Sequence, residues 1–149
     1  MSAPRLLYAD ATAVLRLLFD RPGPRAPIMA AAVVASSSLL EVEVFRTLDS
    51  ARMRRAIDDY QSARLRVEAA ALLATFHLFP IADEVIRSAR SPFGVDVRAM
   101  PAIHVATAEL VERESASRAE FWTHDPAQAA AAISRGLAVH GAELGGRVG

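Results

Sequence analysis

Three acidic side chains occupy positions from which they could form a common site. Asp10 directly follows the apolar run of residues 5–9, and Asp125 follows a second run at residues 120–123. Glu43 lies about one helical turn into a later segment that reads as a helix. Three carboxylates brought together would repel one another, and a hard cation such as Mg²⁺ or Mn²⁺ is the usual agent that offsets this repulsion. The pattern therefore indicates a candidate metal site.

The chemistry open to such a site is hydrolysis of a phosphodiester bond. A bound divalent cation orients a water molecule, lowers its pKa and stabilises charge on the phosphoryl oxygens. A second interpretation is purely structural, because aspartates at helix N-termini accept backbone hydrogen bonds. Asp125 precedes Pro126, a residue typical of the first position of a helix, so Asp125 also fits a helix cap. The spacing alone leaves both interpretations open.

The segments that would position these acids alternate between strands and helices. Apolar runs predict strands at residues 5–9, 31–35, 77–81, 120–123 and 137–140. Helices are predicted over residues 12–19, 39–48, 52–76, 83–90, 101–114 and 126–135. This order is typical of an α/β fold with three layers, in which helices flank a central, mostly parallel five-stranded sheet. Ligands bind beyond the carboxyl ends of such strands, which favours Asp10 and Asp125 as site residues.

Particular residues predict where these helices begin and end. Thr12, the serines at positions 36–38 and Asp83 offer side-chain acceptors for N-caps. Pro101 suits the first position of its helix, and Gly136 suits the stop after residue 135. In the longest helix, the residues predicted to form one apolar face are Met53, Ile57, Tyr60, Val67 and Ala74.

The composition is that of one globular domain. The chain has 149 residues and 52% hydrophobic content, and a domain of this size buries roughly 68–70% of the surface that its unfolded chain exposes. We expect a domain over residues 1–141 and a flexible glycine-rich tail over residues 142–149. The absence of cysteine excludes disulfides and thiolate metal sites. With no signal peptide or membrane segment predicted, a cytoplasmic location is expected.

All 17 basic residues are arginine, and the net charge is zero. Codon bias in a GC-rich genome explains the arginines, although guanidinium groups also bind phosphate in a bidentate manner. Net neutrality means that no overall basic field attracts nucleic acid, so any RNA contact must come from a local arginine patch. The best candidates for phosphate contacts are Arg52, Arg54, Arg55, Arg64 and Arg66.

Two early segments resemble motifs of the PIN-domain family. In the first, Asp10 follows the first strand and Thr12 comes two residues later. In the second, a serine-led run at residues 36–38 opens a helix that carries Glu43, with Arg46 three residues farther on.

Two later segments complete the resemblance. Residues 102–108 read Ala-Ile-His-Val-Ala-Thr-Ala and look like the third motif of the family, and residues 121–125 look like the fourth. The resemblance covers residues 6–139, and its pattern is similar to that of the VapC-like toxins of bacterial toxin–antitoxin pairs.

The resemblance implies an activity and a set of roles. It implies an endoribonuclease dependent on Mg²⁺ or Mn²⁺, in which the catalytic metal-binding acids are Asp10, Glu43 and Asp125. It also implies supporting residues that hydrogen-bond within the cleft or pair with an acid, and these are Thr12, Arg46 and Thr123. The implied partners are an RNA substrate, a small antitoxin that occupies the cleft, and a second copy of the chain in a homodimer.

Pro101 departs from the family pattern. An acid commonly opens the third-motif helix at this position, and proline offers no ligand. In one interpretation the three other acids still hold a metal, because water can fill a vacated position around Mg²⁺, and Asp96 of the preceding loop is a candidate additional ligand. In the other, the domain is a degenerate module that binds RNA or a protein without cutting. Both stay open.

Two further polar residues have structural interpretations. His104 matches the third motif, but a histidine among apolar residues is more often a hydrogen-bonded structural group than a ligand. Glu41 is two positions from Glu43, so the two cannot share a helix face, and Glu41 is expected to face solvent.

Overall fold

The computed structural model describes residues 5–19 and 32–141. Within these residues one sheet contains five strands, all of them parallel, in the order β3-β2-β1-β4-β5. The strands are β1 (Arg5–Ala9), β2 (Ala32–Ser37), β3 (His77–Phe79), β4 (Ala119–Trp122) and β5 (Ala138–His140). All five predicted strands are confirmed, and each boundary lies within two residues of its predicted place.

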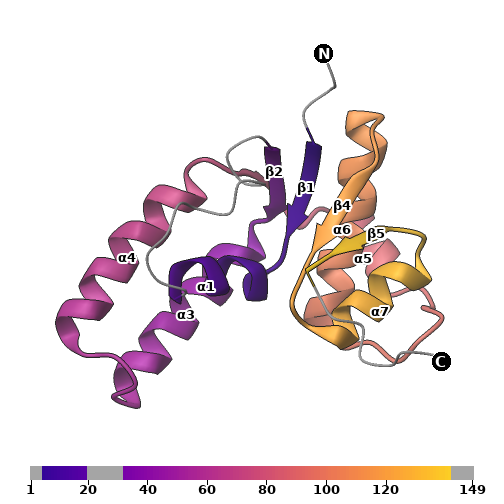
Figure 1. The fold of residues 1–149 in the computed structure, drawn as a ribbon. Coiled ribbons are helices and arrows are strands. Elements are labelled where there is room, and N and C mark those ends of the chain that lie inside the picture. Colours follow the sequence, from indigo (N-terminus) through magenta and orange to yellow (C-terminus); the bar gives the residue numbers. More distant parts are fainter. Residues whose placement is uncertain (1–4, 20–31, 142–149) are drawn as a thin grey trace, which may run out of the picture.

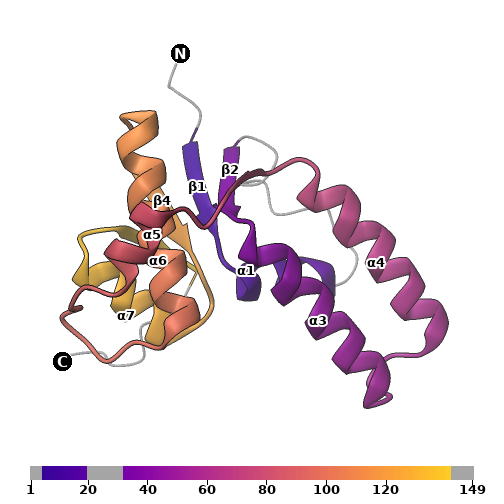
Figure 2. The same cartoon turned by 180° about the vertical axis from the view of Figure 1, so that it is seen from behind.

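Helices cover both faces of this sheet (Figures 1 and 2). One layer holds α1 (Ala11–Phe19), α3 (Leu39–Met53) and α4 (Asp59–Leu73). The opposite layer holds α5 (Asp83–Ala89), α6 (Ala99–Ser115) and α7 (Pro126–Ser134). The predicted three-layer α/β fold with a central parallel sheet is therefore confirmed. No helix in the described ranges is long and apolar enough to cross a bilayer.

The alternation of side chains along β1 divides the core into two halves. Leu7 and Ala9 pack with residues of α1, α3 and α4, whereas Tyr8 packs with residues of α6 and α7 on the other face. Each of these three side chains is fully buried. Because β1 is the central strand, its carboxyl end is enclosed by both helical layers. A polar residue that follows β1 is thus held from two sides.

The boundary between the two long helices differs from the prediction. The sequence predicts a break between residues 48 and 52, but α3 continues to Met53 and α4 begins only at Asp59. Arg55 has a φ of 59°, which ends the first helix in a left-handed conformation. Asp58 then forms a capping box with Gln61 and starts the second helix.

The predicted apolar face of residues 52–76 is wrong for most of its members, although Ile57 is half-buried and packs against the core. Met53, Tyr60 and Val67 are each 71% or more exposed. The residues that α4 buries instead are Ser62, Leu65, Ala69, Leu72 and Leu73. Both sets have helical spacing, so periodicity does not decide between them, and packing of α4 against α3 selects the narrower leucine and alanine stripe.

Several predicted caps are also corrected. Thr12 lies inside α1, and the acceptor at the start of that helix is Asp10, because its carboxylate accepts the Ala13 amide at 2.9 Å. The side chain of Ser38 caps nothing, whereas the Ser37 hydroxyl accepts the amide of Leu39 at 3.1 Å.

The predicted starts of two further helices also need correction. Ala82 occupies the N-cap of α5, so the Asp83 side chain lies in the first turn and makes no cap. Pro101 is the third residue of α6 rather than the first. Its missing amide hydrogen still falls among the unpaired donors of the first turn, so the proline is tolerated there. The expected tail over residues 142–149 lies outside the described residues, and the domain bounds stay a prediction.

Candidate functional site

The buried carboxyl group of Asp10 lies at the end of β1. β1 and β4 are parallel neighbours, with Ala9 paired to Trp122, so Asp10 and Thr123 leave the sheet side by side. The Asp10 side chain accepts hydrogen bonds from the Thr12 hydroxyl at 2.7 Å, from the Ala13 amide, and from the Thr123 hydroxyl. Only 1% of Asp10 is exposed. The parallel register therefore places this carboxylate where the sequence predicts it.

Burial raises the pKa of Asp10 above its usual range. The hydrogen bonds from Thr123, Thr12 and the Ala13 amide act in the opposite direction, as does the electrostatic influence of His104, but desolvation is the largest effect. The charged form of this carboxyl is therefore costly in its surroundings. A nearby cation would offset that cost, and pKa shifts of this kind cluster at functional sites.

Two threonines connect Asp10 to the turn that carries Asp125. The Thr123 hydroxyl donates to Asp10, accepts the Asp125 amide at 3.0 Å and lies 3.3 Å from the Thr12 hydroxyl. The Thr12 hydroxyl also accepts the His124 amide at 2.8 Å. Thr12 and Thr123 thus fix the relative positions of two predicted acids, which is the supporting role that the family resemblance implies for them.

Asp125 is the N-cap of α7, and its Oδ1 accepts the amide of Ala127 at 2.9 Å. Pro126 occupies the first helical position. The structural interpretation of Asp125 is therefore confirmed. Capping does not compete with a role at the site, because a capping carboxylate keeps its negative charge.

Glu43 is held by a chain of buried polar groups. Its Oε1 lies 2.5 Å from Nε2 of His104, and Nδ1 of that ring lies 2.7 Å from the Tyr8 hydroxyl. Burial raises the pKa of Tyr8, so the phenol keeps its proton. Both ring nitrogens thus have a polar partner, the Tyr8 hydroxyl at Nδ1 and the Glu43 carboxylate at Nε2.

This chain of groups connects the two helical layers. Glu43 lies on α3, His104 lies on α6 on the other side of the sheet, and Tyr8 lies on β1 between them. Only 1% of His104 is exposed, and its ring also packs edge-on against Tyr8. His104 is thus the hydrogen-bonded structural group that the sequence predicts, and it also orients the Glu43 carboxylate.

The two networks are neighbours at the carboxyl edge of the sheet. His104 influences the pKa of Asp10 electrostatically, and the Ser36 hydroxyl links β2 to the end of β1 by donating to the Ala9 carbonyl at 2.6 Å. Across the described ranges, however, no three acidic or histidine side chains form a group that could hold a metal ion by themselves. The oxygen donors suit a hard cation, but the chain supplies a partial set of ligands rather than a closed cage.

A partial set is compatible with Mg²⁺ chemistry. This ion usually keeps several water ligands and is bound through one or two carboxylates together with substrate phosphates. Thr123 links the Asp10 carboxylate to the backbone amide of Asp125, and these two acids are the pair that could provide such carboxylates.

No protein-family model matches this chain, and no curated protein sequence matches it. The resemblance to the PIN-domain family therefore stays a prediction carried by the four motifs.

The other predicted site residues lie farther from this edge. Arg46 pairs with Asp49 at 2.6 Å on the same helix, so it pairs with an acid as expected, but its partner is not Glu43. Asp96 is exposed and lines a separate cavity of about 300 Å³ with Arg90 and Arg98. Within the described part of the chain, nothing connects Asp96 to Asp10.

The sequence prediction assigns no role to two residues that help to form the site. Tyr8 fixes the His104 ring, and Ser36 ties β2 to the end of β1. A usable signal exists for both, because a polar side chain inside a buried parallel strand needs a hydrogen-bonding partner. The identity of that partner depends on tertiary packing.

Proposed function

We propose that this chain is an endoribonuclease dependent on Mg²⁺ or Mn²⁺, with Asp10, Glu43 and Asp125 as its catalytic acids. The observation that carries the proposal is the buried Asp10 carboxylate at the centre of the carboxyl edge, connected through the Thr123 hydroxyl to the Asp125 turn. A buried carboxylate with a raised pKa, at the sheet edge where α/β folds bind ligands, is characteristic of a site that binds a cation or carries out a metal-assisted reaction.

Different residues of the chain would have different roles at such a site. Thr12 and Thr123 hold the Asp10 carboxylate in one orientation, and the His104 ring does the same for Glu43. A divalent cation, when bound, would supply an activated water and charge stabilisation at the phosphoryl group. Burial of Asp10 limits competition from bulk water and strengthens its attraction for a cation.

The four motifs extend this proposal to a biological role. They support a VapC-like toxin of a toxin–antitoxin pair, acting on RNA in the cytoplasm and restrained by a small antitoxin protein. They also support a homodimer, since that assembly is common in the family that the motifs resemble.

A cleavage assay on purified chain tests the activity. Total RNA is incubated with Mn²⁺, with Mg²⁺ or with EDTA, and the fragments are resolved on a gel. We expect cleavage only with metal, and a loss of roughly 100-fold or more in Asp10→Asn and Glu43→Gln. Glu41→Gln is the matched control, because Glu41 is exposed on the same helix and should cut like wild type. Cleavage that persists in Asp10→Asn would contradict the proposal.

A second candidate function is a PIN-like module that binds RNA or a protein without cutting. Two observations favour it: Pro101 occupies the first turn of α6, where the family pattern has an acid, and the described residues form no group of three metal ligands. The Pro101→Asp variant separates the candidates, with Pro101→Asn as a control of similar size and no charge. Cleavage that appears only in Pro101→Asp would establish the non-catalytic function for the natural chain, whereas equal cleavage by wild type would reject it.

A further inference from the structure

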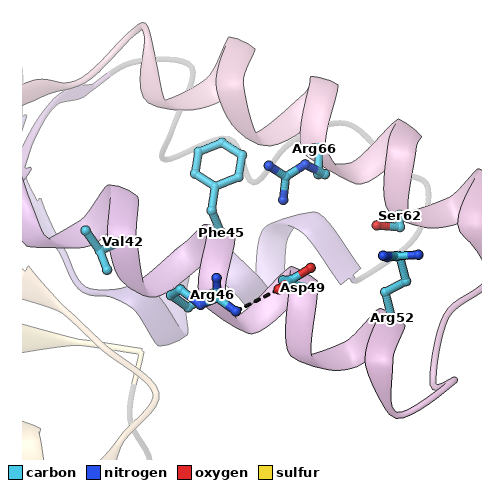
Figure 3. A pocket seen from close by; sticks show the side chains of 7 residues that line it. All are labelled: Val42, Phe45, Arg46, Asp49, Arg52, Ser62 and Arg66. Atoms are coloured by element: carbon cyan, nitrogen blue, oxygen red, sulfur yellow. Dashed lines mark hydrogen bonds and ion pairs between the residues drawn. The ribbon is translucent and has the colours of Figure 1, made fainter.

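A groove between α3 and α4 gathers arginine side chains (Figure 3). Its volume is about 520 Å³. Arg46 and Arg52 enter it from α3, and Arg66 enters it from α4. Among the described residues that line it, Asp49 is the only acid. Three guanidinium groups thus face one carboxylate in a chain whose net charge is zero.

The ion pairs in the groove leave much of this positive charge available. Arg46 pairs with Asp49 at 2.6 Å, but 70% of the Arg46 side chain is exposed. Arg52 pairs at 3.1 Å with Asp59, whose side chain is 89% exposed, so the pair is weakened by solvent. A competing anion could replace either partner at little cost.

Arg66 is held in a different way. Its guanidinium lies over the ring of Phe45, 5.1 Å from the ring centroid, and none of the ion pairs among the described residues includes Arg66. Figure 3 shows these two side chains directed toward each other across the space between the helices. A cation–π contact of this kind restrains the guanidinium, which lowers the entropy lost when its N–H groups bind an anion.

The groove lies along the helix that carries Glu43. Glu43 is three residues before Arg46 on α3, which is about 4.5 Å along the helix axis, and nine residues before Arg52, which is about 13.5 Å. The start of α3 follows the carboxyl end of β2 directly, so the arginines lead away from the sheet edge along the helix. If a nucleic-acid strand reached Glu43 and continued along α3, the guanidinium groups of Arg46 and Arg52 would lie near its phosphates.

We propose that this groove binds the phosphates of single-stranded RNA that flanks the cut site. This inference rests on the proposed ribonuclease function. Guanidinium groups form bidentate, charge-assisted hydrogen bonds with phosphate, and a basic groove that follows the backbone is typical of single-strand binding. The half-buried Phe45 and the exposed Val42 add an apolar wall that a ribose or a base could contact. The position of Arg46 and Arg52 on the helix that carries Glu43 favours RNA over an acidic peptide as the occupant.

Binding is measured by fluorescence anisotropy of a labelled single-stranded RNA in EDTA, over a series of salt concentrations. We expect Arg52→Gln/Arg66→Gln to bind roughly tenfold or more weakly than wild type. The slope of log affinity against log salt should fall in magnitude by about 0.7 for each phosphate that the variant no longer neutralises. Arg87→Gln is the matched control, because Arg87 is exposed on α5 in the opposite helical layer and lies outside the groove. Arg66→Lys should bind between wild type and Arg66→Gln, since it keeps the charge but loses the planar fork.

The results separate this proposal from the nuclease proposal. Wild-type affinity and slope in the double variant, with its fold verified by circular dichroism, would overturn the groove assignment even if the chain cuts RNA. Arginine-dependent binding by a chain that cuts nothing with Mn²⁺ would support the groove and reject the nuclease. Displacement of the RNA by polyglutamate at equal charge concentration would overturn the RNA assignment in favour of an acidic protein.

Discussion

At the scale of single residues, two opposed effects act on the pKa of Asp10. Desolvation raises the pKa of its carboxyl, while two hydroxyl groups and one amide stabilise the charged form. Because the raised pKa is the net result, folding into this environment favours the protonated carboxyl. The position is therefore a place where the chain gives up stability at neutral pH, which is a common feature of functional sites.

Replacement of Asp10 by asparagine should reveal this lost stability. A raised pKa means that the folded chain binds the proton more tightly than the unfolded chain, so the free energy of unfolding falls as pH rises from the usual aspartate range towards the folded pKa. Asp10→Asn lacks this contribution. We expect its free energy of unfolding, relative to wild type, to increase as the pH rises above the usual aspartate range of about 4. Urea denaturation in EDTA measures it, and a pH-independent difference would show that Asp10 titrates normally.

At the scale of elements, the strands follow from the sequence and the helix boundaries follow less well. Buried parallel strands appear as short apolar runs, and those runs placed Asp10 and Asp125 at one sheet edge. The capping box of Asp58 and Gln61 indicates where α4 begins, whereas apolar periodicity does not. The bond between Glu43 and His104 has no sequence signal, because it joins helices from opposite layers.

The turn between α3 and α4 gives a prediction at this scale. Arg55 has a φ of 59°, a conformation that costs roughly 1 kcal/mol for a residue with a Cβ and that glycine adopts freely. We expect Arg55→Gly to raise the free energy of unfolding by up to about 1 kcal/mol. Arg54→Gly is the matched control and should be destabilising, because Arg54 has a φ of −83°. Chemical denaturation measures both, and destabilisation by Arg55→Gly would show that the turn has no strain to relieve.

At the scale of the whole molecule, the strand order explains where the site forms. From β1 the chain builds the sheet outward through β2 and β3, then returns to the other side of β1 for β4 and β5. The order thus reverses between β1 and β4, and α/β sheets bind their ligands at such a reversal. Asp10 and Thr123 follow these two strands. The topology alone would select this edge, and the arginine groove lies farther along α3, the helix that carries Glu43.

A cation bound at this edge would join elements that no covalent bond connects, so it should stabilise the whole fold. Any ligand that binds only the folded chain raises its stability by mass action. We expect Mn²⁺ to raise the melting temperature of wild type and to leave that of Asp125→Asn unchanged. Asparagine caps a helix about as well as aspartate, so the variant should melt close to wild type in EDTA. Calorimetric scans with and without Mn²⁺ measure both effects. Equal shifts in the two proteins would remove Asp125 from the set of metal ligands.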